Sequence, residues 1–79
     1  MDLMVTLYST PTCAPCRVAE KRLDAAGLLA GKVDLTQNPD KVEELKERLG
    51  TSTLHTPILE FEGELFGMAD LGNIIRSVN

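Results

Sequence analysis

Two closely spaced cysteines, Cys13 and Cys16, carry the clearest chemical signal in the chain, and they are its only cysteines. An apolar stretch that ends at Tyr8 precedes them, and a segment with helical periodicity follows them. A Cys-x-x-Cys between a strand and a helix is typical of thiol redox chemistry. The predicted helix would place Cys13 at its N-terminus, where unpaired N–H groups and the helix dipole favour a thiolate. Cys16 would lie one turn further on, close enough to form a disulfide with Cys13.

The two sulfur atoms are expected to have different roles, because thiol–disulfide exchange needs an accessible thiolate and a second thiol that releases the mixed disulfide. Cys13 is the expected attacker, with its pKa lowered by the helix N-terminus and by Arg17. Cys16 is more buried in the expected helix and is the expected resolving thiol. Ala14 and Pro15 shape the loop between them, and Pro15 has no N–H to offer the thiolate.

A zinc site and a structural bridge are the alternatives to redox chemistry. A structural zinc ion usually needs four ligands, whereas this chain has one cysteine pair and a single histidine, His55. A bridge between Cys13 and Cys16 would close a very small loop and stabilise the fold little. The redox interpretation is therefore preferred, with no metal bound. His55 is expected to be a solvated loop residue, and a catalytic role for it is the alternative because its imidazole can titrate near neutral pH.

The size and charge of the chain narrow its class. The 79 residues are expected to form one domain, 1–79, with an ordinary hydrophobic fraction of 43%. A net charge of -4 without a basic cluster argues against nucleic-acid binding. The apolar runs are too short to cross a bilayer, so no membrane association is expected. The first residues lack the basic region of a signal peptide. A cytoplasmic protein is expected, and in that compartment a cysteine pair is more often catalytic or metal-binding than structural.

The apolar periodicity predicts four strands and three helices. The expected strands cover residues 3–8, 32–35, 57–61 and 64–66, and the expected helices cover 14–26, 39–49 and 71–78. Asn38 and Asp70 are the expected caps of the last two helices, and a tight turn is expected at residues 62–63. The expected buried helix positions are Ala19, Leu23 and Ala26 with Val18 beside them, then Val42, Leu45 and Leu49, and finally Leu71, Ile74, Ile75 and Val78. The order β-α-β-α-β-β-α implies an α/β fold with a mixed sheet, helices on its faces and the first two strands parallel.

With these elements in place, the chain resembles the thioredoxin superfamily at its small, glutaredoxin-like size, and most closely the NrdH-type redoxins. The motifs that carry the resemblance are Cys13-Ala14-Pro15-Cys16-Arg17, Val33-Asp34-Leu35 followed by Asn38-Pro39, Thr56-Pro57, and Phe66-Gly67-Met68-Ala69-Asp70-Leu71. The resemblance implies a thioredoxin-like fold, with a four-stranded mixed sheet flanked by three helices. It also implies that the peptide bond before Pro57 is cis and that Pro57 faces the cysteine pair.

The resemblance further implies a substrate-binding surface around the cysteines. The Thr56 backbone would offer strand-like hydrogen bonds to a bound peptide or thiol. The N–H groups of Ala69 and Asp70 would be available to a ligand carboxylate such as that of glutathione. The expected substrate-binding residues are Thr12, Ala14, Pro15, Thr56, Pro57, Gly67, Met68, Ala69 and Asp70.

The expected function is that of a monomeric dithiol redoxin that reduces protein disulfides, with ribonucleotide reductase as one candidate substrate. A thioredoxin-reductase-type flavoenzyme would recharge it, and it would bind no cofactor besides its own redox-active disulfide. The alternative is a glutaredoxin that takes its electrons from glutathione. Two departures weigh against it: Thr10 stands where glutathione-using relatives often carry a basic residue, and Phe66 replaces the first glycine of their glycine pair. A binding module without catalysis is a third hypothesis, from another class.

Overall fold

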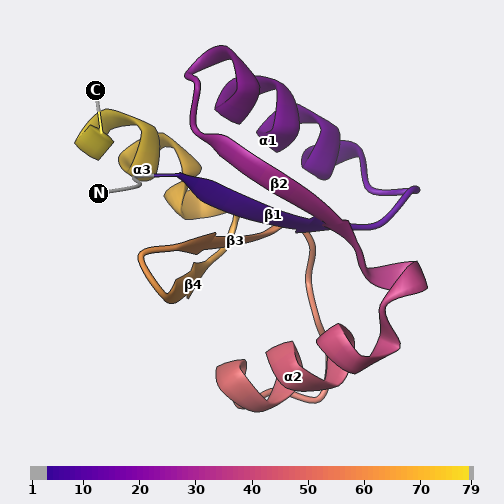
Figure 1. Ribbon diagram of the computed structural model, residues 1–79. Helices are drawn as coiled ribbons and strands as arrows, with labels where there is room; N and C mark the ends of the chain where they lie inside the picture. Colours follow the sequence, from indigo (N-terminus) through magenta and orange to yellow (C-terminus); the bar gives the residue numbers. More distant parts are fainter. Residues whose placement is uncertain (1–3, 79) are drawn as a thin grey trace.

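A four-stranded mixed sheet is the centre of the fold in the computed structural model, which describes residues 4–78 (Figure 1). Its strands are β1 (Val5–Ser9), β2 (Leu29–Asp34), β3 (Ile58–Phe61) and β4 (Glu64–Phe66), and their order across the sheet is β2-β1-β3-β4. Strand β1 pairs in parallel with β2 and antiparallel with β3, and β4 returns antiparallel beside β3. The predicted mixed sheet and its parallel first pair are therefore confirmed.

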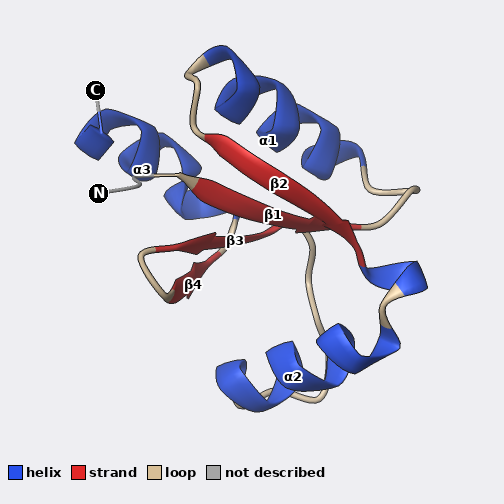
Figure 2. Cartoon of the chain, viewed as in Figure 1, coloured by secondary structure: helices blue, strands red, loops and turns tan. Residues whose placement is uncertain are grey.

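Three helices cover the sheet, with α1 (Ala14–Ala25) and α3 (Leu71–Val78) on one face and α2 (Pro39–Leu49) on the other (Figure 2). Two short 3-10 turns, η1 (Leu35–Gln37) and η2 (Met68–Asp70), lead into α2 and α3. The alternation of side chains along β1 explains the two layers. Val5 and Leu7 are buried against α1 and α3, whereas Tyr8 is buried in the cluster under α2.

The boundaries of the first three strands differ from the predicted ones, and β3 begins at Ile58, one residue later than predicted. The first strand begins at Val5 and ends at Ser9, Met4 precedes it at 36% exposure, and the predicted residue 3 lies outside the described residues. The second strand begins at Leu29, three residues earlier than predicted, because parallel pairing with β1 from Val5 onwards outweighs the low strand propensity of the Ala-Gly pair that follows Leu29. It ends at Asp34, and the next residue begins η1.

The first two helices show two corrections to the predicted buried faces. Val18 is 49% exposed, because the face of α1 that meets the sheet carries Cys16, Ala19 and Leu23. Leu49 is 44% exposed, although it was expected in the buried stripe of α2. It lies in the last turn of α2, where the short β4 strand leaves one side of it open to a shallow pocket. Leu45 is fully buried, as predicted.

The predicted helix caps are also corrected. The side chain of Asn38 makes no capping hydrogen bond to α2 but donates to the main-chain oxygen of Asp34 at 2.7 Å. Asp70 is the last residue of η2, with its N–H donating to the Gly67 oxygen at 3.1 Å, and within residues 4–78 its carboxylate accepts no hydrogen bond. The reason is that η2 already supplies a turn of hydrogen bonding before α3 begins. Gly50 ends α2 in the left-handed conformation with φ 66°, which favours glycine.

The last helix and the hairpin follow the pattern. Leu71 and Ile74 are buried and Ile75 packs beside them, whereas the side chain of Val78 lies outside the described part of the structure. Glu62 and Gly63 both have positive φ, as the two central residues of a tight hairpin turn require. No helix within residues 4–78 combines the length and apolarity needed to cross a membrane.

Candidate redox-active site

The cysteine pair lies where β1 gives way to α1, as the sequence predicts. Cys13 is the residue that caps α1, with extended backbone angles of φ -94° and ψ 106°. Its own N–H donates to the Thr10 oxygen at 3.3 Å, which closes the loop between strand and helix. Its sulfur accepts a hydrogen bond from the N–H of Cys16 at 3.2 Å. A cysteine thus takes the place that a serine or aspartate usually fills, and the helix N-terminus directs an N–H donor at its sulfur.

A disulfide joins Cys13 and Cys16, whose Cα atoms lie 5.2 Å apart. The two residues differ in accessibility: Cys16 is 3% exposed, on the face of α1 that packs against the sheet, whereas Cys13 is half-buried. The neighbouring Ala14 and Pro15 are exposed. A large disulfide substrate can therefore approach Cys13 but not Cys16, which is the asymmetry that the predicted roles of attacker and resolving thiol require.

The segment before β3 forms the second part of the site. The peptide bond between Thr56 and Pro57 is cis, as the resemblance implies. Because Ile58 is opposite Tyr8 in the antiparallel pair, Pro57 lies next to the end of β1, from which the cysteine loop continues. Pro57 is buried and Thr56 is half-buried. Among the described residues, Thr56 makes no hydrogen bond to another main-chain group, so its N–H and C=O have no strand partner.

Two hollows flank this region. The first, of about 330 Å³, is lined by Cys16 and by charged side chains from α1 and β2, among them Arg17, Glu20 and Lys32. Lys32 pairs there with Glu20 at 3.1 Å. The second hollow, of about 350 Å³, lies between α2 and the loop that leads to Thr56. We call it the Thr56 groove, and it is lined by Thr10, Leu35, Val42, Lys46, Leu54 and Thr56, with hydroxyl side chains along its rim.

The remaining predicted binding residues lie in and beside η2, beyond β4. Gly67 and Asp70 line a separate pocket together with His55 and Phe66. No hydrogen bond within residues 4–78 joins this segment to the cysteine pair, so their common role in binding stays a prediction. Of the other predicted residues, Thr12 and Ala69 are exposed and Met68 is half-buried against the core.

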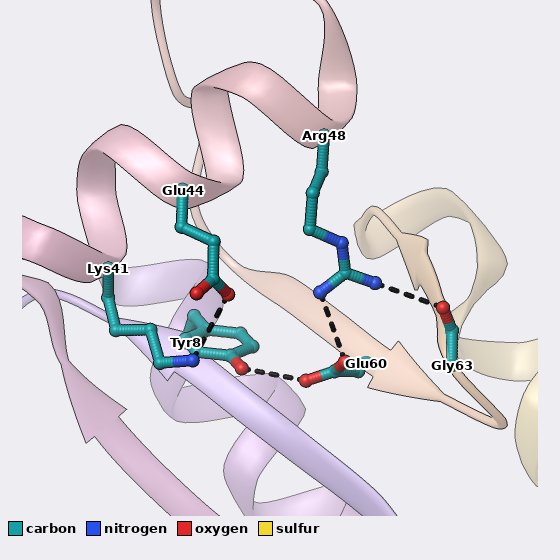
Figure 3. Close-up of polar contacts among 6 residues, drawn as sticks. All are labelled: Tyr8, Lys41, Glu44, Arg48, Glu60 and Gly63. Carbon is teal, nitrogen blue, oxygen red and sulfur yellow. Dashed lines mark hydrogen bonds and ion pairs between the residues drawn. The ribbon is translucent and has the colours of Figure 1, made fainter.

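A polar network under α2 was not predicted from the sequence (Figure 3). The Tyr8 hydroxyl donates to Glu60 Oε1 at 2.7 Å, and Arg48 Nη1 contacts Glu60 Oε2 at 3.1 Å. Arg48 also donates to the Gly63 oxygen at 2.9 Å. The network therefore joins the end of β1, the middle of β3, the hairpin turn and the last turn of α2. The available signal was strand alternation, which places Tyr8 and Glu60 on the same face of the sheet.

Both acidic groups of the network have shifted pKa values. Burial raises the pKa of the Tyr8 phenol to about 12, and the hydrogen bond to Glu60 and the charge of that carboxylate act in the same direction. The hydrogen bond from Tyr8 lowers the pKa of Glu60 below its ordinary value, and Arg48 adds to this effect. The neutral phenol and the ionised carboxylate are thus the paired forms at neutral pH.

Comparison with known proteins agrees with this geometry. Two crystal structures of the thioredoxin-like protein BC3987, one of them a mutant, superpose on the chain with TM-scores of 0.78 (mutant) and 0.74. The mutant is 17% identical to this chain, and the alignment covers 95% of this chain and 99% of the mutant. The other structure is 18% identical, and the alignment covers 89% of this chain and 97% of that one. At this identity the likeness shows the fold alone, which is thioredoxin-like. No curated protein matches the chain.

The family is shown by the sequence itself. The glutaredoxin family model matches residues 5–66, a span that begins with β1 and ends with β4. It includes the disulfide of Cys13 and Cys16 and the cis bond before Pro57. With its disulfide at the start of α1 and that cis bond beside the end of β1, the chain belongs to the glutaredoxin family and is a thiol redoxin.

Proposed function

We propose that this redoxin reduces disulfides of protein substrates through its dithiol and is recharged by a thioredoxin-reductase-type flavoenzyme. The observation that carries the proposal is the unequal exposure of the two sulfur-bearing residues, with Cys13 half-buried at the helix start and Cys16 3% exposed behind it. One accessible and one protected thiol are what a two-step exchange needs, because only the first reacts with the substrate directly.

The exchange begins with the reduced protein. The Cys13 thiolate attacks one sulfur of the substrate disulfide, forms a mixed disulfide and releases the other substrate sulfur as a thiolate, which takes up a proton. Cys16 then loses its proton and attacks the Cys13 sulfur, which releases the second substrate thiolate and closes the Cys13–Cys16 disulfide. The substrate gains the two electrons that the redoxin loses, and its two thiolates take up two protons, one equivalent to the proton that Cys16 loses and one from the solvent. The N–H of Cys16, which points at the Cys13 sulfur, stabilises negative charge on it before attack.

The electron source is inferred from what surrounds the cysteine loop. Thr10, on the rim of the Thr56 groove, presents a hydroxyl where glutathione-using relatives often carry a cation. Phe66 is half-buried against the core, at the position of their first paired glycine. Both features reduce the fit to the charged ends of glutathione. Glutathione is the second candidate donor, and membership of the glutaredoxin family is the observation that favours it.

A coupled assay separates the two electron sources. The oxidised protein is incubated with insulin as a disulfide substrate and NADPH, in one cuvette with thioredoxin reductase and in the other with glutathione and glutathione reductase. We expect NADPH consumption in the first cuvette. Turnover only in the second would overturn the proposal in favour of a glutathione-dependent glutaredoxin.

Two cysteine variants test the assigned roles in the same assay. Cys13→Ser should abolish reduction while the fold persists, which would reject the non-catalytic binding module. Reduction that continues in this variant would show that Cys13 is not the attacking thiol. Cys16→Ser should still attack a disulfide but stop at the mixed disulfide, which mass spectrometry detects as a covalent adduct. An adduct on Cys16 in the Cys13→Ser variant, formed as fast as that on Cys13, would reverse the two roles.

The physiological setting follows from the same chemistry. Ribonucleotide reductase is our candidate substrate, since it is an intracellular enzyme whose turnover leaves a disulfide for an external dithiol to reduce. We place the redoxin in the cytoplasm as a monomer, because a reducing compartment keeps its thiols ready for reaction. Stoichiometric reduction of an oxidised ribonucleotide reductase by the reduced protein tests the pairing, and failure to restore its thiols would exclude that substrate.

A further inference from the structure

The Thr56 groove is the second hollow beside the cysteine loop, and the reaction steps above make no use of it. Leu35, Val42 and Leu54 form its floor, and the last two are only partly buried, so apolar surface remains open. Its volume of about 350 Å³ is near the lower end of the range for ligand pockets, about 300–1,000 Å³. The space therefore suits one or two side chains rather than a large cofactor.

The groove is continuous with both parts of the redox-active site. Thr10, on one rim, accepts the hydrogen bond from the Cys13 N–H that closes the cysteine loop. Thr56, on the other rim, precedes the cis bond and has a backbone without main-chain partners among the described residues. An extended chain that pairs with Thr56 and brings a sulfur to Cys13 must therefore pass the mouth of the groove.

The charge of the groove is the second clue to its occupant. Lys46 is the one charged side chain that lines the groove in the described structure, and no carboxylate lines it. Its partner Glu43 lies 3.9 Å away and is 79% exposed, so the pair is loose. In a chain with a net charge of -4, a loosely paired cation beside apolar side chains favours an apolar group that has an acidic neighbour.

We propose that the Thr56 groove binds an apolar side chain next to the reactive cysteine of a polypeptide substrate, with an acidic residue of that substrate facing Lys46. This inference rests on the proposed reduction of protein disulfides and names the substrate class: an extended, acidic segment with an aliphatic or aromatic residue within two positions of its cysteine. The groove then acts as a specificity site, and the chemistry at Cys13 is unchanged.

A peptide series tests the proposal without any reductase. The probes are short alanine peptides with one cysteine in mixed disulfide with 2-nitro-5-thiobenzoate, whose release by the reduced protein is followed by absorbance. Leucine replaces alanine in turn at the two positions on each side of the cysteine. We expect leucine at one of these positions to raise the second-order rate constant about tenfold, because one aliphatic side chain becomes buried. The symmetric aromatic disulfide of the same thiol is the small substrate that does not fill the groove.

Matched variants place the effect in the groove. Ser52→Trp fills the groove from its exposed rim, and Ser77→Trp makes the same change on the exposed surface of α3. Ser52→Trp should reduce the leucine preference to less than about twofold, and Ser77→Trp should keep it. Val42→Thr makes the floor more polar with little change of shape and should weaken the preference if Ser52→Trp does not fold. All three should react with the small disulfide as the parent does.

A second peptide pair tests whether Lys46 favours an acidic residue in the substrate. An aspartate beside the favoured leucine should raise the rate about two- to fivefold at low salt, and added salt should remove the gain. Lys46→Gln should lose this gain, whereas Lys41→Gln, on the same helix but outside the groove, should keep it. Leucine without effect at every position, or a preference that survives Ser52→Trp and Val42→Thr, would overturn the proposal. Failure of the reductase assay with the leucine preference intact would instead overturn only the proposed electron source.

Discussion

Removal of the Tyr8 hydroxyl is expected to destabilise the fold measurably, because this hydroxyl donates a hydrogen bond to the charged Glu60 carboxylate. Tyr8→Phe keeps the ring, which is 3% exposed, and deletes the donor that lies 2.7 Å from Glu60. A hydrogen bond to a charged group contributes about 1.5–3 kcal/mol. The Glu60 side chain is 28% exposed, so water replaces part of the lost bond. We therefore expect a loss of about 1–2 kcal/mol in the free energy of unfolding.

The size of this loss should depend on pH in a defined direction. The pKa of Glu60 is lowered in the fold, first by the bond from Tyr8. A carboxyl with a lowered pKa contributes stability that is present above its unfolded pKa, about 4.3, and is lost as the pH falls through its folded pKa. The difference between Tyr8→Phe and the parent should therefore be largest near neutral pH and shrink as the solution is acidified below about pH 4.

Urea unfolding of both proteins across this pH range measures the effect, and thermal unfolding should show a drop of about 4–8 °C for each kcal/mol. Glu60→Gln is the matched variant, since it keeps an oxygen acceptor and removes the charge. The double variant completes a cycle that isolates the coupling between the two side chains. A coupling below about 0.5 kcal/mol, or a Tyr8→Phe loss that does not change with pH, would refute the assigned role of the bond.

Three further predictions concern the same fold. The pKa of Tyr8 is about 12 in the fold against an ordinary 10.0, so the free energy of unfolding should fall as the pH rises from 10 to 12. Urea unfolding at a series of pH values measures this fall, which should be absent in Tyr8→Phe. Gly50→Ala should cost about 1–2 kcal/mol by urea unfolding because of its φ of 66°, whereas Gly67→Ala, with φ -104°, should cost little. Leu59→Ala should lower the free energy of unfolding by about 2–5 kcal/mol, because Leu59 is fully buried. Leu49→Ala should lower it clearly less in the same assay, because Leu49 is 44% exposed.

The fold could be predicted largely because its signals are local. Apolar alternation located β1, β3 and β4, and the Asn-Pro start and glycine end located α2 within its observed bounds. The start of β2 could not be located in this way, since Ala30 and Gly31 are strand residues only through pairing with β1. The exposure of Val18 and Leu49 also depends on which neighbours each helix face meets, and a helical pattern does not specify those neighbours.

In the candidate site, too, the features that depend on neighbouring residues could be predicted, and the contacts between distant elements could not. The placement of Cys13 and Cys16 follows from a strand, a loop and a helix that are adjacent in the sequence, so the pattern predicted it. The cis bond before Pro57 was implied by the family resemblance, because periodicity alone favours the trans form. The bonds between Tyr8, Glu60 and Arg48 join three elements that are distant in the chain, and alternation indicates a shared face but not a partner.

The network and the groove are consequences of one arrangement. The cysteine loop leaves the end of β1 and the Thr56–Pro57 segment enters β3, so the antiparallel pairing of Tyr8 with Ile58 brings both parts of the site together at one sheet end. The sheet does not by itself fix α2, which supplies Val42 and Lys46 to the groove. Arg48, two residues beyond Lys46, holds the end of that helix to Glu60 and to the hairpin turn. The same bonds that stabilise the fold thus hold α2, which lines the groove, against the sheet from which the cysteine loop continues.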